Sequence, residues 1–575
     1  MILGIVLLAG SIPTSVVEPK QNSALVTIVG KVAEDGGNLV LGSSQLCDSF
    51  DPAESFDAWC AVVFRLYSRN VMSFSSKPGL AGFETQPDLA AATPRVHSSK
   101  AIWTFQIRKN AFWNSGKPVT VADIRYSIER LFSPEHIGAV NFNYLCLLSS
   151  CPKGVPSYQG PGMRGEKHLY SIRTTTKDTI TFKLTSPNPN FDRVLALPQF
   201  SVVEMSRDLY LKRKKQAYRN LPSSSGPFVL KLDAKRQRAA FTRNKYWTQA
   251  SDAIRAPHVK TIKWRVISDS KLLTKATLRN QIDVRIGEDF QFANADLAAA
   301  SKKYGAQIDQ PYTGFTSFLA VRSKSAPLNR ISCRQAIFYA IDKEAIQRVK
   351  GGETKAQIAT SLLPPLVAGY DASSDSYNSG SKPTGDLIAA EAALKKCGYP
   401  EGFEVSMAYL NIGIGTEIFR KVQSSLARVG IVLAPKKFDN YSKFVSVTRS
   451  DEQLTNEGIA LVISGAQSMI NSPLDYWSSF VDGRFTKPYD NENLAGLSDE
   501  QINAALDDIA TGNKDARTLS GQINDQVMEN ATYLPITYDK FLLYRSPQIA
   551  GVYVQQALGG QYDIVNVGLV KTAKK

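Results

Sequence analysis

The sequence lacks the short motifs by which several large classes of enzyme are recognised. It contains no G-x-x-x-x-G-K-[ST] phosphate-binding loop, no G-x-S-x-G nucleophile elbow and no H-E-x-x-H zinc motif. Its four histidines are widely spaced, so they form no local pair of metal ligands. We therefore expect no catalytic residues, no metal site and no cofactor. Because catalytic triads are assembled in space, a dispersed site in a secreted α/β enzyme stays open as an alternative.

The sequence also has no apolar run long enough to cross a bilayer. Its most apolar stretch, Met1 to Gly10, is too short to span but suits the central region of an export signal. We interpret residues 1–20 as an export signal, incomplete because a positively charged start is missing; a first β-strand is the alternative. We expect an exported protein at the extracellular face of the membrane or in the periplasm.

Cysteine is scarce and never forms a C-x-x-C pair, which leaves disulfides as the main expectation. In an oxidising compartment the neighbouring pairs are favoured, and the last two residues would pair by elimination. The expected disulfides are Cys47–Cys60, Cys146–Cys151 and Cys333–Cys397. The alternative is a set of buried free thiols, with the third pair the most open to it.

Acidic residues are fewer than basic ones: 52 Asp and Glu stand against 68 Lys and Arg, a formal charge of +16. The densest basic run, Lys212 to Lys215, is short, and there is no zinc-finger spacing, basic heptad region or RNP-type motif. We therefore expect no nucleic-acid partner. The excess charge predicts a solvated cationic surface, or attraction to an anionic cell envelope or an anionic ligand.

A chain of 575 residues is too long for one hydrophobic core, so two or more lobes are expected. Alternating residues predict half-buried strands at 102–108 and 179–184, and Thr120 can cap a helix that follows it. Farther along, we predict helices over 334–349, 386–396 and 416–429, and strands over 315–321, 403–410, 431–433 and 458–463. Helices that alternate with apolar strands indicate an α/β fold.

Aromatic residues are abundant, with 23 Tyr, 26 Phe and 6 Trp. Several lie among polar residues, as in Phe142-Asn143-Tyr144 and Asp475-Tyr476-Trp477. Ordinary core and loop packing explains such residues in many proteins. The alternative is a pocket lined by aromatic rings, which combine a large contact area with a polar tip.

The stretch from Trp103 to Phe132, WTFQIRKNAFWNSGKPVTVADIRYSIERLF, combines a strand, Arg-Lys, an aromatic, Gly, Pro-Val-Thr, Ala-Asp and an aromatic-Ser helix. It resembles the signature of the family-5 extracellular solute-binding proteins of ABC importers. Shorter matches extend the resemblance over residues 36 to 570: Phe50-Asp51-Pro52, Pro87-Asp88-Leu89-Ala90, Ser225-Gly226-Pro227-Phe228, Cys333 to Asp342, Leu426 to Ile431, Leu534-Pro535-Ile536 and Tyr562-Asp563.

The resemblance implies a two-lobed fold of the periplasmic-binding-protein type II, a "Venus flytrap" that closes on ligand. It implies lobe I over residues 21–311 plus 538–575, with an extra subdomain at about 62–205, and lobe II over 312–537. It also implies a monomer that captures an oligopeptide or another small molecule and delivers it to ABC permease subunits. Ser11 stands where a lipid-anchored member has Cys, which argues against a lipid anchor.

The largest departure from the family pattern lies where peptide-binding members carry Gly-Trp-x-x-Asp, whose carboxylate holds the ligand's α-ammonium. Gly465 is kept, but Ala466 replaces the Trp and Met469 stands at the Asp position. The nearest carboxylate, Asp475, lies six residues farther on and is not expected to substitute. Tyr441 stands near the place of a ligand-stacking Trp. This departure leaves the ligand open: an oligopeptide held by main-chain contacts, or a neutral or anionic metabolite such as a sugar or a metal chelate.

The residues that we expect to contact ligand are Phe56, Asp57, Asn143, Tyr144, Tyr441, Ser464, Gly465, Gln467, Ser468, Met469 and Trp477. Gln467 and Ser468 suit neutral hydrogen bonding, and Met469 suits adaptable apolar contact. The alternative for the segment 464–469 is that it only packs. Besides an enzyme, a chaperone or adhesion role is the remaining alternative from another class.

Overall fold

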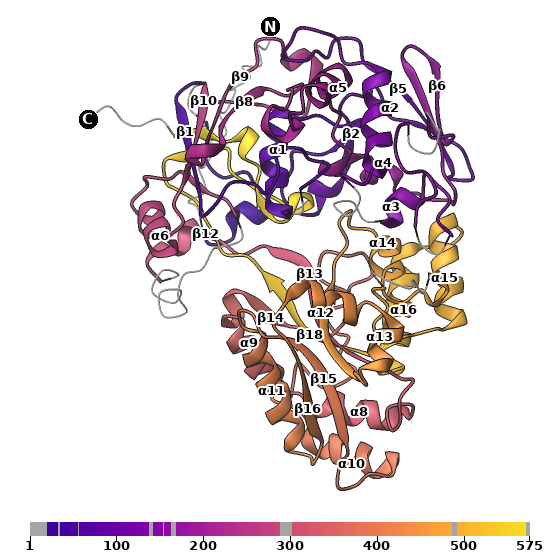
Figure 1. Ribbon diagram of the computed structural model, residues 1–575. Coiled ribbons are helices and arrows are strands. Elements are labelled where there is room, and N and C mark those ends of the chain that lie inside the picture. Colours follow the sequence, from indigo (N-terminus) through magenta and orange to yellow (C-terminus); the bar gives the residue numbers. More distant parts are fainter. Residues whose placement is uncertain are drawn as a thin grey trace, which may run out of the picture.

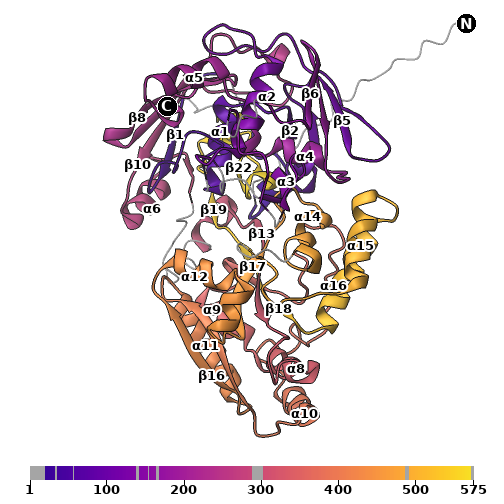
Figure 2. The same cartoon turned by 45° about the vertical axis from the view of Figure 1, so that its right-hand side comes forward.

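The computed structural model describes residues 20–32, 35–55, 57–136, 142–152, 155–162, 168–287, 302–485 and 491–570. These residues form two α/β bodies, one above the other in Figures 1 and 2, and each body has its own hydrophobic core. The core of lobe I draws on residues from Ala24 to Ile286 and again from Leu543 to Val567, together with Ile470. The core of lobe II draws on Phe318 to Ile536. The two-lobed α/β architecture is therefore the one expected.

Lobe I is built on a five-stranded sheet in the order β11-β1-β10-β9-β8. Strand β1 runs parallel to β10 and β11, and the other neighbours are antiparallel. Phe241, Ile262 and Trp264 alternate with charged or polar residues, so one face of the sheet is buried. The strands are β1 (Asn38–Ser43), β8 (Phe228–Asp233), β9 (Arg238–Arg243), β10 (Thr261–Val266) and β11 (Val284–Arg285).

A second part of lobe I carries a four-stranded antiparallel sheet in the order β4-β5-β7-β6. The expected strands at 102–108 and 179–184 are its two central strands. Thr120 caps α2 as expected, in a reciprocal capping box with Asp123. The elements are β4 (Arg95–Val96), β5 (Ile102–Gln106), α2 (Val121–Glu129), α3 (Phe142–Cys146), β6 (Ile172–Thr176), β7 (Thr179–Lys183), α4 (Phe191–Ala196) and α5 (Met205–Arg213). Lobe I also contains α1 (Ala61–Tyr67), β2 (Met72–Phe74), β3 (Thr85–Pro87) and α6 (Ser270–Leu278).

Lobe II is built on a six-stranded mixed sheet in the order β14-β18-β13-β17-β15-β16. The strands are β13 (Tyr312–Val321), β14 (Ala356–Ile358), β15 (Glu404–Leu410), β16 (Val432–Phe438), β17 (Leu461–Ala466) and β18 (Tyr533–Lys540). The helices are α8 (Ile331–Ala340), α9 (Lys343–Val349), α10 (Leu387–Cys397), α11 (Gly415–Ala427), α12 (Tyr441–Thr448), α13 (Asp451–Asn456), α14 (Pro473–Ser478), α15 (Glu500–Thr511) and α16 (Ala516–Glu529).

One expected helix of lobe II is divided in two. The apolar spacing over 334–349 predicts a single helix, but α8 ends at Ala340 and α9 begins at Lys343. The side chain of Asp342 accepts a hydrogen bond from the backbone N–H of Ala345 at 2.8 Å, so it caps a new helix. A local N-cap has overridden the helical periodicity.

Two chain segments run side by side between the lobes (Figure 1). Strand β12 (Ile308–Asp309) pairs antiparallel with β19 (Leu543–Tyr544), and just beyond them Tyr312 of β13 pairs with Lys540 of β18. The remaining short strands lie in the C-terminal stretch that returns to lobe I: β20 (Ile549–Ala550), β21 (Val554–Gln555), β22 (Gln561–Tyr562) and β23 (Gly568–Leu569). The exact limits of the lobes, at 311/312 and 537/538, stay a prediction.

The six cysteines form three disulfides, Cys47–Cys60, Cys146–Cys151 and Cys333–Cys397, which confirms the expected pairing. The first two pairs lie in lobe I and the third joins α8 to α10 in lobe II. Among the residues that the structure describes, no helix combines the length and the apolar character that a bilayer crossing needs.

Candidate functional site

A small, partly open cavity of about 90 Å³ lies at the junction of the two lobes. Lobe I contributes Ser55, Asp57, Ala58, Trp59, Ala61, Phe64, Phe83, Leu197, Pro198, Gln199, Gln556, Ala557, Leu558 and Gly559. Lobe II contributes Leu366, Val367, Gln467, Ser468, Met469 and Asn471, and the connecting segments contribute Thr313, Gly314 and Phe541. The lining is mainly apolar, and among the residues that the structure describes Asp57 is the one with a charged side chain.

The segment after β17 reaches across the junction from lobe II. Its Ile470 is 1% exposed and packs into the hydrophobic core of lobe I. Arg193 of α4 donates to the backbone oxygens of Ile470 and Asn471, at 3.1 and 2.9 Å. Asn190 donates to the Ser472 hydroxyl at 3.0 Å. These contacts hold the two lobes together on the side of the cavity.

Asp475 is at the centre of this interlobe contact. The Tyr144 hydroxyl, from α3 of lobe I, donates to Asp475 Oδ1 at 2.7 Å. Within lobe II, the Ser468 hydroxyl and the Met469 backbone N–H donate to Oδ2 at 2.8 and 3.1 Å. Burial raises the pKa of the Asp475 carboxyl, and these hydrogen bonds oppose the rise. The carboxylate therefore fixes the shape of segment 468–475, so it does not act as the missing ligand anchor.

The expected contact residues separate into two groups. Four of them line the cavity: Asp57, Gln467, Ser468 and Met469. Tyr144 contacts the segment beside the cavity through its hydrogen bond to Asp475. Ser464 and Gly465 lie within β17, paired with β13, and Asn143 lies beside Tyr144 on α3. Phe56 lies outside the described residues.

Of the expected residues that the structure describes, those that do not line the cavity are Asn143, Tyr144, Tyr441, Ser464, Gly465 and Trp477. Tyr441 begins α12 and is 62% exposed. Trp477 is fully buried in the core of lobe II, where its Nε1 donates to the Ser520 hydroxyl at 2.9 Å. Neither residue is among those that line the cavity.

Gly465 is explained by packing. A Cβ at this position would lie 2.2 Å from the Phe315 ring and 2.6 Å from the Thr316 carbonyl oxygen. Only glycine therefore lets β13 and β17 approach each other here. Cavity residues from the C-terminal stretch, such as Gln556 and Leu558, were not expected, because nothing near them in sequence marks a site.

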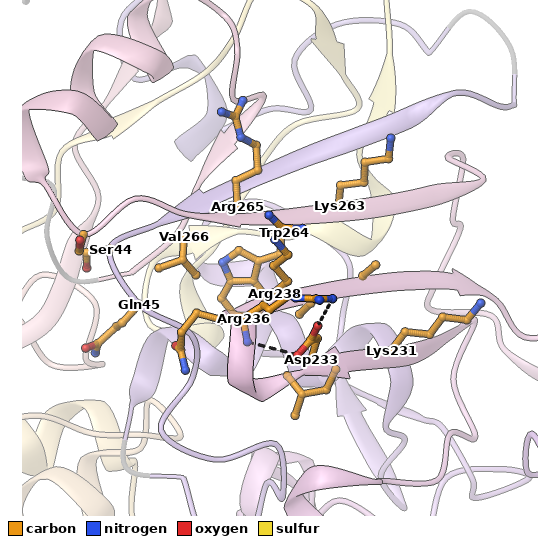
Figure 3. A pocket seen from close by; sticks show the side chains of 15 residues that line it. Ser44, Gln45, Lys231, Asp233, Arg236, Arg238, Lys263, Trp264, Arg265 and Val266 are labelled. Atoms are coloured by element: carbon orange, nitrogen blue, oxygen red, sulfur yellow. Dashed lines mark hydrogen bonds and ion pairs between the residues drawn. The ribbon is translucent and has the colours of Figure 1, made fainter.

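A second hollow lies elsewhere, over the ends of β8, β9 and β10 in lobe I (Figure 3). It is an open groove of about 1020 Å³ with Trp264 at its floor. Its charged residues are Lys231, Asp233, Arg236, Arg238, Lys263 and Arg265, so five cations face one carboxylate. Asp233 is paired with Arg236 at 3.5 Å. Although it is larger, the groove is open to solvent and involves one lobe only.

Two α/β lobes joined by paired strands, with a cavity between them, define a type II periplasmic binding protein, and comparison with known proteins agrees. Residues 84–487 match the model of the bacterial extracellular solute-binding proteins, family 5 Middle. The chain belongs to this family of solute-binding proteins.

Three similar proteins illustrate the relationship. The structure of clavulanic acid biosynthesis oligopeptide binding protein 2 is 30% identical, with a TM-score of 0.87, and the match covers 96% of this chain and 99% of that one. The periplasmic binding protein DppA from Helicobacter pylori, solved with the peptide STSA, has a TM-score of 0.67 at 20% identity, covering 94% of this chain and 99% of that one. The glutathione-binding protein GsiB of Escherichia coli K12 is 21% identical over 524 residues, 90% of this chain and 91% of that protein.

Proposed function

We propose that this protein is the exported solute-capturing subunit of an ABC importer and that it binds a peptide or peptide-like ligand between its lobes. The observation that carries the proposal is the cavity itself, lined from both lobes and from both connecting segments in a family-5 chain. Its relatives include oligopeptide-, peptide- and glutathione-binding proteins, which supports a peptide ligand. A non-peptide metabolite, such as a sugar or a metal chelate, is the second candidate because Met469 replaces the expected carboxylate.

Ligand entry requires the lobes to separate. A cavity of about 90 Å³ is smaller than a ligand site of several hundred Å³, so the described conformation corresponds to a closed protein. We assign lobe I to residues 21–311 plus 538–575, with a subdomain at about 62–205, and lobe II to 312–537. The paired strands β12–β19 and the ends of β13 and β18 then form the hinge. Opening breaks the contacts of Tyr144, Asn190 and Arg193 with the segment 470–475.

The closed protein would present both lobes to ABC permease subunits in the membrane, as a monomer and without chemistry of its own. No cavity-lining residue in the described part of the chain is a histidine or a cysteine. A binding role without catalysis fits these side chains.

Two measurements test the proposed function. Mass spectrometry of small molecules released from the denatured, freshly purified protein should identify peptides. Small-angle scattering on protein freed of ligand should then show a larger radius of gyration than on protein saturated with the identified peptide. Release of sugars or chelates without peptides would favour the second candidate, and an unchanged radius at saturation would contradict closure.

A further inference from the structure

Several polar groups of the junction cavity already have hydrogen-bond partners within the protein. The three hydroxyl groups of the lining all donate to protein acceptors: Ser55 to Asp48 at 2.6 Å, Thr313 to the Asp539 carbonyl at 3.2 Å and Ser468 to Asp475 at 2.8 Å. The Gln467 side-chain amide is turned toward the Met469 sulfur at 2.8 Å. The donors of these four side chains are therefore engaged within the protein.

The acceptors are not engaged in this way. Gln556 is only 8% exposed, yet its Oε1 accepts no hydrogen bond from any residue that the structure describes. The same holds for the buried Oδ1 of Asn471, on the other lobe. Both residues line the cavity. A buried amide oxygen without a donor costs free energy, so such atoms indicate a partner that the closed protein does not itself supply.

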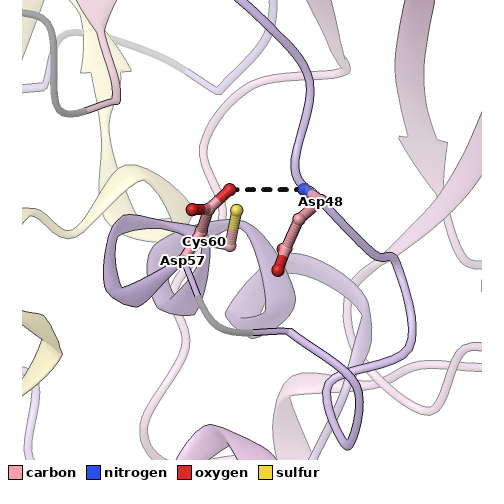
Figure 4. A group of neighbouring side chains, drawn as sticks. All are labelled: Asp48, Asp57 and Cys60. Atoms are coloured by element: carbon pink, nitrogen blue, oxygen red, sulfur yellow. Dashed lines mark hydrogen bonds between the residues drawn. The ribbon is translucent and has the colours of Figure 1, made fainter. Parts of the chain in front are cut away.

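Asp57 adds a negative charge to this set of acceptors. It lies in the loop closed by the Cys47–Cys60 disulfide, directly before the turn of helix at Ala58–Cys60. Its Oδ2 accepts from the Asp48 backbone N–H at 3.3 Å (Figure 4). Within the described residues, no Lys, Arg or His forms an ion pair with it. The adjacent Cys60 sulfur belongs to the disulfide, so the cluster of Asp48, Asp57 and Cys60 offers no thiolate to a metal ion.

We propose that the junction cavity recognises a cationic group with several N–H donors, an alkylammonium or a guanidinium, with Asp57 as its counter-ion. The amide oxygens of Gln556 and Asn471 are buried without a donor, and a shift of these side chains lets them accept further N–H groups of the same cation, one from each lobe. Trp59, Phe64 and Phe83 of the lining suit the apolar stem of such a group and the face of the cation. This inference rests on the proposed function, and it places the charge-bearing anchor on lobe I in place of the carboxylate that Met469 has replaced.

The electrostatics of Asp57 agree with this role. Partial burial, with a contribution from Asp48, raises the pKa of the Asp57 carboxyl. A cation bound beside the carboxylate opposes both effects, because opposite charge favours the ionised form. Closure over the cation also satisfies Gln556 and Asn471, so a cationic ligand stabilises the closed form more than a neutral one of the same shape.

The test compares matched peptides by calorimetry. The probes are acetyl-Ala-Arg-Ala-amide, its neutral isostere with citrulline, and the N-terminally free forms of both. We expect the wild-type protein to prefer a cationic probe over its neutral match by about 10- to 100-fold, the range for a hydrogen-bonded charge. A preference for arginine over citrulline assigns the site to a side chain, and a preference for the free amine assigns it to the α-ammonium.

Two variants decide the role of Asp57. Asp57→Asn keeps the shape and should bind cationic and neutral probes within twofold of each other, whereas Asp57→Glu should recover part of the preference. Asp233→Asn, which removes a carboxylate from the outer groove, is the matched control and should behave as wild type. Equal binding of all four peptides by the wild type, or a preference that survives in Asp57→Asn, would overturn the inference.

Failure of the proposed function would give a different pattern. If no peptide bound the wild-type protein, peptide capture would be wrong, and the cation site would be judged on agmatine, a guanidinium compound without a peptide bond. Agmatine binding that is lost in Asp57→Asn would keep the site, and absence of agmatine binding would overturn it.

Discussion

The cavity at the lobe junction and the groove on lobe I differ in every property by which a binding site is usually chosen. The cavity holds about 90 Å³, is less open than the groove and has one carboxylate among the described residues that line it. The groove holds about 1020 Å³, is open and has five cations. They lie back to back, because Trp59 of the cavity wall packs edge-on against Trp264 of the groove floor, with ring centroids 6.1 Å apart.

The difference shows that the net charge of a chain reflects the charges on its surface and does not predict the charge inside its binding site. The formal charge of +16 predicts a cationic exterior, and the groove is part of that exterior. Inside the junction, where water is largely excluded, a single carboxylate outweighs distant surface charges that solvent and salt screen. A large groove on one lobe is also weaker evidence for a ligand site than a small cavity that forms between two lobes.

The largest expected effect comes from filling the cavity. Ala58 is exposed but lines the cavity, so Ala58→Trp should occupy the space of the ligand without disturbing a core. We expect the affinity for acetyl-Ala-Arg-Ala-amide to fall by about 100-fold or more, since a steric clash opposes closure. Ala240→Trp places the same side chain in the groove and should change the affinity less than twofold. If the groove variant lost the peptide instead, the roles of the two regions would be reversed.

A smaller effect is expected at the rim. Tyr144→Phe removes the interlobe hydrogen bond to the buried Asp475 carboxylate. Because hydrogen bonds to charged groups are worth about 1.5–3 kcal/mol, the ligand-free protein should shift toward the open form by about tenfold or more. Scattering should report a larger radius of gyration. Tyr441→Phe is the control, since that residue is exposed and outside the cavity; an identical radius for both variants would show that Tyr144 does not hold the lobes closed.

A smaller difference between the cavity and the groove is expected when the pH is lowered. The pKa of Asp57 is raised, so its charge, and with it the affinity for the arginyl peptide, should be present at neutral pH and be lost as pH falls through that pKa. The loss begins at a higher pH than for an ordinary aspartate and approaches tenfold per pH unit below the pKa. Acidification does not lower the net positive charge of the protein surface, so retention on a cation exchanger should not fall.

The citrulline peptide is the control for acidification, because its binding also senses Asp475, whose pKa is raised too, but not the charge of Asp57. Calorimetry at several pH values measures both peptides. A pH dependence that is equal for the two peptides, or that persists in Asp57→Asn, would show that groups other than Asp57 cause it.

The smallest effect is expected from reversing charges in the groove. The double variant Lys231→Glu/Lys263→Glu should change the peptide affinity less than twofold, because solvent and salt screen charges on an open surface. It should elute clearly earlier from a cation exchanger. A severalfold gain in affinity for the arginyl peptide would mean that the groove cations reach the cavity electrostatically.

Much of the local structure could be predicted from neighbouring residues. The capping box at Thr120, the alternating strands of the four-stranded sheet and the neighbouring cysteine pairs all depend on contacts close in sequence. The division of the helix over 334–349 into two helices could not be predicted. Its apolar spacing continues across the break, and the N-cap at Asp342, which begins the second helix, competes with that spacing.

The site was only partly predictable, for a different reason. Gln467, Ser468 and Met469 were found because they occupy the place of a family motif. Trp477 occurs in a similar aromatic setting in the sequence, yet it is buried in the core of lobe II. Gln556 and Leu558 line the same cavity although more than 350 residues separate them from Phe83.

By itself, then, the sequence determined the family, the α/β class, the two disulfides between neighbouring cysteines and the loss of the usual carboxylate at Met469. These depend on motifs and on short spacings, which a chain keeps whatever its final shape. Only the tertiary structure decided that Asp57 would be the sole charged residue among the described residues that line the cavity, that the Ser468 hydroxyl would be committed to Asp475, and that Gln556 and Asn471 would be left as acceptors. A cavity between lobes is formed by surfaces distant in the chain, so its chemistry exists only once the lobes have met.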